Sequence, residues 1–201
     1  MYLISKRLFD IFFSLVLLIA LLPLFLGIMV ILLVFSKFPV FFCQQRCGLN
    51  GTMFTIIKFR TMVTQSPNNS FYSLGTIDSR ITPVGRWLRK YKLDELPQLY
   101  NILKGDMTFV GPRPRVPKFW TLFPQYKEKI LSVKPGCTDY ATLKYFNEAI
   151  LLNNARNPES LYIQIISPDK IQLHLRYIEE QSIYTDIKIL IRTIACFFRV
   201  M

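Results

Sequence analysis

The chain has one long apolar segment near its N-terminus, followed by shorter apolar pieces between polar and basic stretches. The long segment covers residues 11–35 and is interrupted by Ser14, Pro23 and Gly27. About 25 apolar residues in one straight helix would cross a bilayer. A proline inside a helix removes a hydrogen bond and clashes with the preceding turn. Pro23 therefore predicts a break into two halves that rise about 18 Å each, so neither half crosses a membrane alone.

Positive charge flanks the apolar segment on both sides, at Lys6, Arg7, Lys37 and Arg46. Because lysine and arginine tend to stay on the cytoplasmic side, both ends are expected on that side. We predict a re-entrant membrane helix over residues 1–37, broken at Pro23. A plain membrane span and a cleaved signal sequence are the alternatives. No small-residue cleavage site follows the segment, which argues against the signal sequence.

Short β-prone pieces follow the apolar segment, at residues 40–42 and 53–57. The Asn50-Gly51 pair between them is typical of a hairpin turn. If the second strand continues, Lys58 and Arg60 share one face, because alternate residues of a strand point the same way. Two cations on one face suit a diphosphate. A solvated strand edge, where lysine is common, is the alternative.

Two adjacent carboxylates, Asp94 and Glu95, lie between predicted helices at residues 84–91 and 96–103. The start of a helix has unpaired N–H groups and the positive end of the helix dipole, so it can hold phosphate and keep a carboxylate ionised. An ionised aspartate is a competent nucleophile. The alternative is that Asp94 or Glu95 merely caps the second helix, with Pro97 as an ordinary first-turn proline.

Arg113 lies between two prolines in Gly111-Pro112-Arg113-Pro114. The prolines fix the backbone, so Arg113 is held in a rigid extended turn and loses little freedom on binding. Its guanidinium can grip a phosphate through two hydrogen bonds. A structural ion pair with Asp106 or Glu95 is the alternative.

The remaining segments carry less chemistry. Residues 63–79 are polar and turn-rich and predict a mobile loop over the site. Residues 134–136 predict a turn, and residues 147–155 and 169–180 predict helices. Residues 183–201 form an amphipathic pattern, which fits either a helix in the lipid headgroup layer or an ordinary core-packed helix. Its apolar positions are Ile183, Ile187, Leu190, Ile191, Ile194, Phe197 and Phe198.

Composition narrows the class of protein. A length of 201 residues suits one modest domain plus a membrane element. The net charge of +12, with 51% hydrophobic residues, indicates anionic partners such as lipid headgroups or pyrophosphates. No zinc-finger spacing or RNA-binding motif is present, so we expect no nucleic-acid partner. The four cysteines lack paired metal-binding spacing, and His174 is the only histidine, which argues against a histidine-based triad or metal centre.

Six motifs follow one another in a fixed order. They are Lys6-Arg7-Leu8-Phe9-Asp10, Gln45-Arg46-Cys47-Gly48, Lys58-Phe59-Arg60-Thr61-Met62, Arg80-Ile81-Thr82-Pro83-Val84-Gly85-Arg86, Lys92-Leu93-Asp94-Glu95-Leu96-Pro97 and Gly111-Pro112-Arg113-Pro114. This order closely resembles the bacterial sugar transferases, also called monotopic phosphoglycosyl transferases. The resemblance covers about residues 1–136 and is weaker beyond them.

The resemblance implies transfer of a phosphosugar from a UDP-sugar to polyprenyl (undecaprenyl) phosphate, which releases UMP and initiates glycan or exopolysaccharide assembly. It implies an enzyme of the bacterial cytoplasmic (inner) membrane, with its catalytic domain on the cytoplasmic face. Downstream glycosyltransferases and a second copy of the chain are further expected partners. The expected fold is α+β and mostly helical. It combines the re-entrant helix, a small β-hairpin and a compact catalytic domain over residues 38–201 with amphipathic interfacial helices.

The resemblance also assigns roles to residues. Asp94 is the expected nucleophile that forms an aspartyl-phosphosugar intermediate, and Glu95 with Asp94 is expected to hold Mg²⁺. Lys58 completes the expected catalytic set. The expected substrate-binding residues are Arg60, Arg89, Arg113, Pro114 and Lys144.

The sequence departs from the family pattern at three positions. Leu22 replaces the serine that often precedes the proline of the membrane helix. Phe146 replaces an arginine that helps bind the phosphosugar, with Lys144 nearby, and His174 replaces an acidic residue. Two interpretations remain open: a divergent subgroup in which Lys144 compensates, or a catalytically weakened membrane protein that binds nucleotide sugars or partner transferases.

Overall fold

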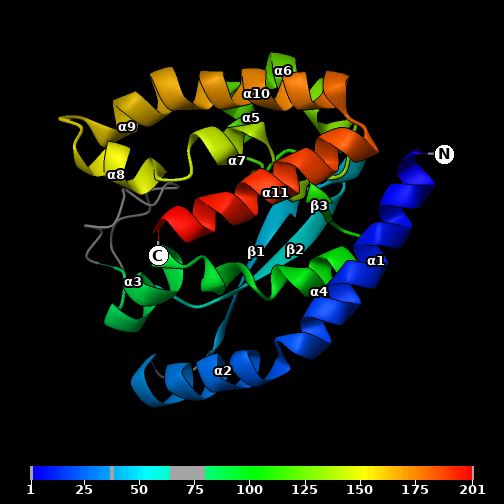
Figure 1. Cartoon of the computed structure of the whole chain (residues 1–201). Helices are drawn as coiled ribbons and strands as arrows, with labels where there is room; N and C mark the ends of the chain where they lie inside the picture. Colours follow the sequence, from blue (N-terminus) through cyan, green and yellow to red (C-terminus); the bar gives the residue numbers. More distant parts are fainter. Residues whose placement is uncertain (1, 37–38, 64–79, 201) are drawn as a thin grey trace.

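The computed structural model describes residues 2–36, 39–63 and 80–200. This part of the chain is mostly helical and carries two small two-stranded sheets, so the predicted α+β class is confirmed (Figure 1). The predicted loop at residues 63–79 lies outside the described residues, apart from Val63. The backbone N–H of Val63 donates to the carbonyl oxygen of Arg80 at 2.9 Å, which brings the two ends of that segment together.

The N-terminal apolar segment forms two helices, α1 (Tyr2–Ala20) and α2 (Leu22–Ser36), which meet at a bend of 60°. No single described helix has the length and apolar character needed to cross a bilayer, whereas the bent pair has them jointly. The predicted break is present but misplaced. It falls at Leu21, and Pro23 is the second residue of α2. A proline is tolerated in the first turn of a helix, where its missing N–H would have no partner.

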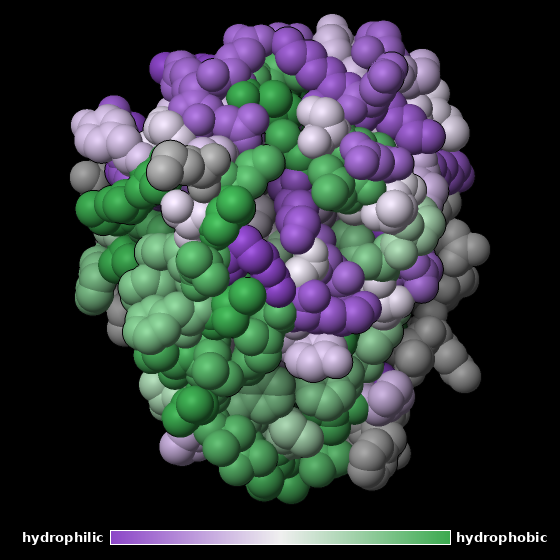
Figure 2. All heavy atoms as spheres, turned by 90° about the vertical axis from the view of Figure 1, so that its right-hand side faces the viewer, coloured by the Kyte–Doolittle hydropathy of each residue, from purple (hydrophilic) through white to green (hydrophobic). Residues whose placement is uncertain are grey.

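Both helices pack one face against the rest of the protein. Ile28 and Leu32 of α2 are 2% and 1% exposed, in a cluster with Phe59 and Leu88. The outer faces of α1 and α2 are apolar and exposed at Leu8, Phe12, Leu15, Ile19, Leu22, Leu26, Val30 and Val34. Figure 2 shows the resulting hydrophobic area over the lower part of the molecule, where α2 and the end of α1 lie in Figure 1.

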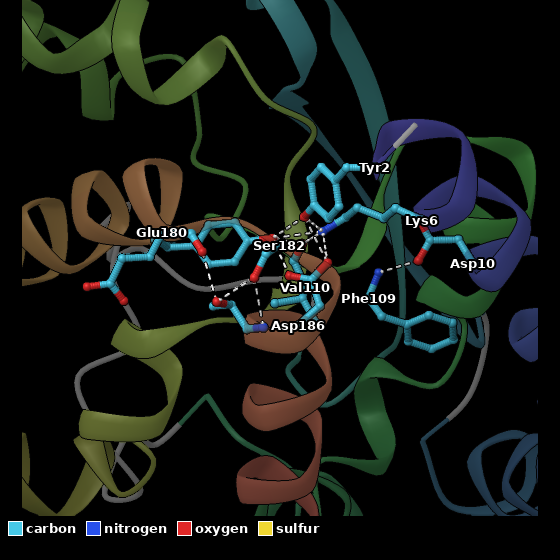
Figure 3. Close-up of polar contacts among 10 residues, drawn as sticks. Tyr2, Lys6, Asp10, Phe109, Val110, Glu180, Ser182 and Asp186 are labelled. Carbon is cyan, nitrogen blue, oxygen red and sulfur yellow. Dashed lines mark hydrogen bonds and ion pairs between the residues drawn. The ribbon is translucent and has the colours of Figure 1, made fainter.

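Lys6 anchors the first turns of α1 (Figure 3). Its Nζ donates to the carbonyl oxygen of Val110 and to the hydroxyl of Tyr177, both at 2.7 Å. It also forms an ion pair of 2.7 Å with Asp186, which accepts a hydrogen bond of 2.9 Å from the hydroxyl of Tyr2. A buried ammonium is costly unless it is paired and hydrogen-bonded. The hydroxyl of Tyr2 also accepts from Nζ of Lys6, at 3.2 Å. These contacts satisfy Lys6, and those to Val110, Tyr177 and Asp186 bind α1 to later parts of the chain.

The β-hairpin is confirmed. Strands β1 (Phe41–Cys47) and β2 (Met53–Phe59) pair antiparallel, with Phe42 opposite Lys58 and Arg46 opposite Phe54. The turn between them uses left-handed backbone at Asn50 and Gly51, with φ of 53° and 79°. Directly opposite residues of a pair share a face, and so do alternate residues of a strand. Arg46 and Lys58 therefore lie on the same face of the hairpin.

The central helices α3 (Pro83–Lys90) and α4 (Gln98–Lys104) match the predicted ones with shifted ends, and a single turn, η2 (Leu93–Glu95), joins them. A second sheet follows, which the sequence did not predict. Its strands β3 (Thr108–Val110) and β4 (Gly136–Thr138) run parallel. Two helices, α5 (Phe119–Leu122) and α6 (Pro124–Leu131), connect these strands.

Two glycines let the second sheet form. A Cβ atom on Gly136 would lie 2.1 Å from the backbone nitrogen of Gly111, and one on Gly111 would lie 2.6 Å from the carbonyl oxygen of Lys134. Only glycine permits this close approach of two backbones. The contact fixes the start of the Gly111–Pro114 segment against β4, and thereby the position of Arg113.

The C-terminal part is built of helices: α7 (Tyr140–Lys144), α8 (Glu148–Asn153), α9 (Pro158–Leu161), the π-type turn η3 (Tyr162–Ile166), α10 (Ser167–Glu180) and α11 (Ile183–Val200). The inner face of α11 contains Asp186 and Ile189, which are 8% and 0% exposed. Most of its predicted apolar stripe points outward: Ile183, Ile187, Ile191, Ile194 and Phe198 are exposed. The other two predicted positions, Leu190 and Phe197, are half-buried, and Leu190 packs against the core cluster that contains Ile189.

Candidate active site

Asp94 and Glu95 lie in the three-residue turn η2. Lys92, the residue directly before this turn, has left-handed backbone (φ 56°). The expectation that they begin a helix is therefore wrong in detail, because α4 starts three residues later, after Pro97. So short a turn has no helix dipole of consequence. Cationic side chains from other elements surround these carboxylates instead.

Glu95 is held between two cations. Its Oε1 accepts from Nζ of Lys58, on β2, at 2.6 Å and from a terminal nitrogen of Arg113. The carboxylate is 18% exposed. Burial alone would raise its pKa, but the charges of Arg113 and Lys58 hold the pKa well below its usual range. Glu95 is thus fixed as an anion. Of the two alternatives for an ion pair of Arg113, the structure has the pair with Glu95, since Asp106 pairs with Lys104.

The pKa of Asp94 is shifted in the opposite direction to that of Glu95. Asp94 is 7% exposed. Among the described residues, none donates a hydrogen bond to its carboxylate, whereas Lys58 and Arg113 both donate to that of Glu95. Burial and the neighbouring charge of Glu95 raise the pKa of Asp94, against the opposing charges of Lys58, Arg89 and Lys92. Two adjacent carboxylates are therefore driven apart in pKa, which is the pattern of a site with divided chemical roles.

The cations of the site respond to the same two carboxylates. Burial lowers the pKa of Lys58, although Glu95 opposes this shift. The charge of Glu95 raises the pKa of Arg113. Arg89, in the last turn of α3, donates from Nε to the hydroxyl of Thr61 at 2.8 Å. Its charge acts on Asp94 and opposes the rise of that pKa. The structure thus brings together Asp94, Glu95, Lys58, Arg89 and Arg113.

Two further predicted residues are close to members of this cluster along the chain. Arg60 is 7% exposed and lies just beyond the end of β2. The carbonyl oxygen of Pro114 accepts a hydrogen bond of 3.3 Å from Arg46, so Pro114 helps to hold the segment that carries Arg113 against β1.

Lys144 is not brought to the cluster. It lies at the end of α7 and pairs with Asp169, at the start of α10, at 2.8 Å. Phe146 contacts the ring of Phe197 with centroids 5.2 Å apart, and Nζ of Lys92 lies 5.7 Å from the Phe146 ring centroid. Phe146 therefore lies beside the side chain of Lys92, which precedes Asp94 by two residues.

His174 belongs to the core rather than to the site. It is 2% exposed, and its Nδ1 contacts Oδ2 of Asp139, which is 0% exposed. Asp139 caps α7 by accepting from the backbone nitrogen of Thr142 at 2.9 Å. Burial alone would raise the pKa of Asp139, but His174 and Thr142 hold it below its usual value. The pair joins α10 to the start of α7.

Sequence reasoning missed three cations beside Arg113. They are Arg46, for which the sequence indicated a flanking charge and a place in a family motif but no role in the site, Arg115 and Lys170. Arg115 follows Arg113 by two residues in an extended segment, and such residues point to the same side. That spacing was the available signal. Nothing in the sequence placed Lys170 nearby.

The protein supplies only part of the ligand set that Mg²⁺ requires. Within the described ranges no group of three or more His, Cys, Asp or Glu side chains is placed to hold a metal ion. Mg²⁺ is commonly bound through one or two carboxylates together with substrate phosphates and water. Asp94 and Glu95 supply two hard oxygen donors of that kind, so the residues present fit a metal that arrives with a phosphate substrate.

Comparisons with known proteins identify the family of the chain. A profile of the family described as bacterial sugar transferase matches residues 1–200. The chain is 36% identical over 202 residues to the undecaprenyl-phosphate glucose phosphotransferase of Komagataeibacter xylinus and 36% identical over 191 residues to EpsL of Bacillus subtilis strain 168, described as an uncharacterized sugar transferase. It is 35% identical over 200 residues to the UDP-glucose:undecaprenyl-phosphate glucose-1-phosphate transferase of Xanthomonas campestris pv. campestris.

These alignments cover nearly all of this chain, between 95% and 96%. They cover 86% of the Bacillus protein but only 35% and 38% of the Komagataeibacter and Xanthomonas proteins. The chain therefore spans little more than a third of the length of two of these relatives.

Proposed function

The chain belongs to the bacterial sugar transferase family, and from this premise we propose that it transfers a sugar 1-phosphate from a UDP-sugar to polyprenyl phosphate. Two of the relatives are named for this kind of transfer to undecaprenyl phosphate. The observation that carries the proposal is the unequal pair of carboxylates, with Glu95 fixed as an anion between Lys58 and Arg113 and Asp94 buried beside it.

In the first step, a carboxylate oxygen of Asp94 attacks the sugar-bearing phosphorus of the donor. A phosphorus–oxygen bond forms to Asp94, and the bond to the bridging oxygen breaks. UMP leaves with that electron pair, so the products are an aspartyl phosphosugar and UMP. Glu95 is the poorer nucleophile, because Lys58 and Arg113 both bind its Oε1 and their charges lower its pKa, which makes the carboxylate less basic. This contrast supports Asp94, which spacing along the sequence could not distinguish from its neighbour.

In the second step, a phosphate oxygen of the acceptor attacks the same phosphorus. The bond to Asp94 breaks, and its carboxylate is regenerated. Phosphoryl transfer depends mainly on positioning and on neutralising charge around phosphorus. Lys58 on β2, Arg89 on α3 and Arg113 in the segment after β3 supply positive charge within the site. Asp94 and Glu95 would hold Mg²⁺, which would add positive charge against the donor phosphates.

The protein acts at a membrane in this proposal, with α1 and α2 as a re-entrant pair and α11 in the headgroup layer on the cytoplasmic side. The exposed apolar faces of α1 and α2 support the first part (Figure 2). The outward stripe of α11 supports the second, because an amphipathic helix with an exposed apolar face suits a lipid interface. A polyprenyl phosphate acceptor is itself held in the membrane.

Release of radiolabelled UMP from a panel of UDP-sugars tests the proposal. Membranes that contain the wild-type chain and polyprenyl phosphate should release UMP from at least one donor, and Asp94→Asn should reduce release to background. Equal release by the two proteins would contradict the assignment of Asp94.

A catalytically weakened protein that binds nucleotide sugars or partner transferases remains the alternative. It is favoured by one observation: Lys144 pairs with Asp169, so it does not take the place of the arginine that Phe146 replaces. Binding of UDP-sugar without UMP release from any donor would establish this alternative.

A further inference from the structure

A second group of cations lies beside the catalytic cluster, on three elements. Arg46 donates from β1 to the carbonyl oxygen of Pro114 at 3.3 Å, so its guanidinium lies against the segment that carries Arg113 and Arg115. Arg115 donates to the hydroxyl of Tyr162 at 2.8 Å. The Nζ of Lys170, on α10, lies 5.9 Å from the centroid of the same tyrosine ring. Tyr162 thus joins Arg115 to Lys170.

Within the described residues, two of these cations, Arg46 and Arg115, lack a full set of hydrogen-bond acceptors. Lys170 is 6% exposed and pairs with Glu148 at 2.7 Å. In the part of the chain that the structure describes, neither Arg46 nor Arg115 forms an ion pair with a carboxylate. Their contacts are to neutral oxygens, and the Nε atom of each is buried without a hydrogen-bond partner. A buried polar group without a partner costs about 1–3 kcal/mol, so such groups call for an explanation.

Mutual repulsion within the group points the same way. Burial, together with the charges of Arg113 and Arg115, lowers the pKa of Arg46 to about 10. Burial also lowers the pKa of Lys170 to about 8, again with contributions from Arg115 and Arg113. Cations are assembled at this cost where an anion is bound, because the anion relieves the repulsion and completes the hydrogen bonds.

We propose that Arg46, Arg115 and Lys170 form, together with Arg113, a second anion subsite that binds the nucleoside-bearing phosphate of the donor. This inference rests on the proposed function. Arg113 belongs to both the catalytic cluster and this second group. It forms an ion pair with Glu95, and its charge also acts on Arg46 and Lys170. A diphosphate carries two adjacent anionic groups, and two adjacent cation groups that meet at Arg113 match that arrangement. UMP, the leaving group, is then bound by the second subsite when it forms.

Calorimetric binding of UMP to the purified full-length chain tests the subsite without relying on turnover. Arg115→Gln should weaken UMP binding about tenfold or more, because a charge-assisted phosphate contact is lost. Arg176→Gln is the matched control. It removes an arginine whose partner, Glu180, is exposed, and it should leave the affinity unchanged. Equal affinities for UMP in wild type and Arg115→Gln would overturn the proposal.

Two further arms separate the possible sources of the anion. Uridine lacks phosphate, so its binding should not respond to Arg115→Gln. If the substitution spares UMP but weakens UDP-glucuronate relative to UDP-glucose, the subsite takes a sugar carboxylate and the proposal is wrong. Lys170→Gln gives a second variant should Arg115→Gln fail to fold, and it should weaken UMP binding in the same direction.

Wild-type protein offers an independent measurement. A bound phosphate favours the charged form of Lys170, so UMP binding near pH 8.5 should take up protons from the buffer. The groups facing Lys170 are Glu148, Arg113, Arg115, Tyr145 and Tyr162. Of these, Tyr145 has its pKa raised to about 12 by burial, so it stays neutral at this pH. Binding heats in two buffers of different ionisation enthalpy report the uptake, which Lys170→Gln should abolish.

The outcome of these measurements is separable from the proposed activity. If the variants bind UMP more weakly but the wild type shows no transfer, the subsite proposal is supported and the proposed enzymatic activity is contradicted. If the wild type shows transfer but both variants bind UMP with unaltered affinity, the activity is supported and the subsite proposal is contradicted.

Discussion

At the scale of single residues, two neighbouring carboxylates take different states because they meet different partners. Glu95 forms ion pairs with Lys58 and Arg113, whereas Asp94 is buried beside the charge of Glu95. The sequence identified both residues, since adjacent carboxylates among cations are visible in one dimension. It could not separate them, because the partners come from β2 and from the segment after β3, far along the chain.

Removal of either cation of this cluster should slow transfer. Lys58→Ala and Arg113→Ala should each reduce steady-state UMP release more than tenfold, since a charge-assisted phosphate contact contributes about 1.5–3 kcal/mol. Arg113→Lys should restore part of the rate, because it returns the charge without the two-pronged geometry. Arg176→Ala, on the exposed side of α10, serves as the control. Near-normal rates in both alanine variants would place Lys58 and Arg113 outside the chemistry.

The buried contact of His174 with Asp139 should contribute to stability rather than to catalysis. Asp139→Asn should lower the free energy of unfolding at pH 7 by about 3 kcal/mol or more, the cost of breaking a buried pair. The pKa of Asp139 is lowered in the folded protein, so its stabilisation is complete above the unfolded value of about 3.9 and is lost as pH falls through the folded pKa.

Thermal unfolding as a function of pH checks this prediction. The difference in melting temperature between wild type and Asp139→Asn should be largest near neutral pH and shrink below about pH 4. A difference that is constant down to acidic pH would show that the charge of Asp139 contributes nothing.

At the scale of elements, the sequence predicted those with a long pattern. Helices α3, α4, α8, α10 and α11 and the hairpin follow from apolar spacing and turn residues. The parallel pair β3 and β4 was missed because three residues are too few to show an alternation, and their partners lie far apart in the chain. The sequence interpreted residues 134–136 as a turn, whereas Gly136 begins β4 and meets Gly111.

That meeting predicts a strong effect of a single methyl group. Gly136→Ala would place a Cβ only 2.1 Å from the backbone nitrogen of Gly111, so the two segments must separate. We expect a loss of stability above about 3 kcal/mol, or failure to fold, as is usual when a buried contact cannot relax. Gly27→Ala in α2 is the matched control, since a Cβ there meets nothing within 4 Å. Equal melting temperatures for Gly136→Ala and wild type would contradict the role of this contact.

At the scale of the whole molecule, apolar surface is gathered on the outer faces of α1, α2 and α11, while the charged cluster lies inside the helical body. The sequence predicted the bend in the apolar segment but placed it two residues late, at Pro23. It treated Lys6 and Arg7 as signals of orientation. In the structure they also hold α1 in place, Lys6 at Val110 and Arg7 through hydrogen bonds of 2.7 and 2.8 Å to the last carbonyls of α4.

The re-entrant arrangement predicts that both ends of the helix pair face the cytoplasm. In intact cells, Leu3→Cys in a cysteine-free background should be protected from an impermeant thiol reagent, and so should native Cys43, exposed on β1, when it is the only cysteine. Both should react in inverted membrane vesicles. Labelling of residue 3 in intact cells would establish a true membrane span.

The central claim is that Asp94 forms a covalent bond to the phosphosugar. Its most direct test is the intact mass of the protein after incubation with donor UDP-sugar in the absence of acceptor. The account predicts that wild type gains the mass of one phosphosugar, that Asp94→Asn gains none, and that addition of polyprenyl phosphate removes the adduct. A full adduct on Asp94→Asn, or transfer to polyprenyl phosphate by that variant at the wild-type rate, would contradict it.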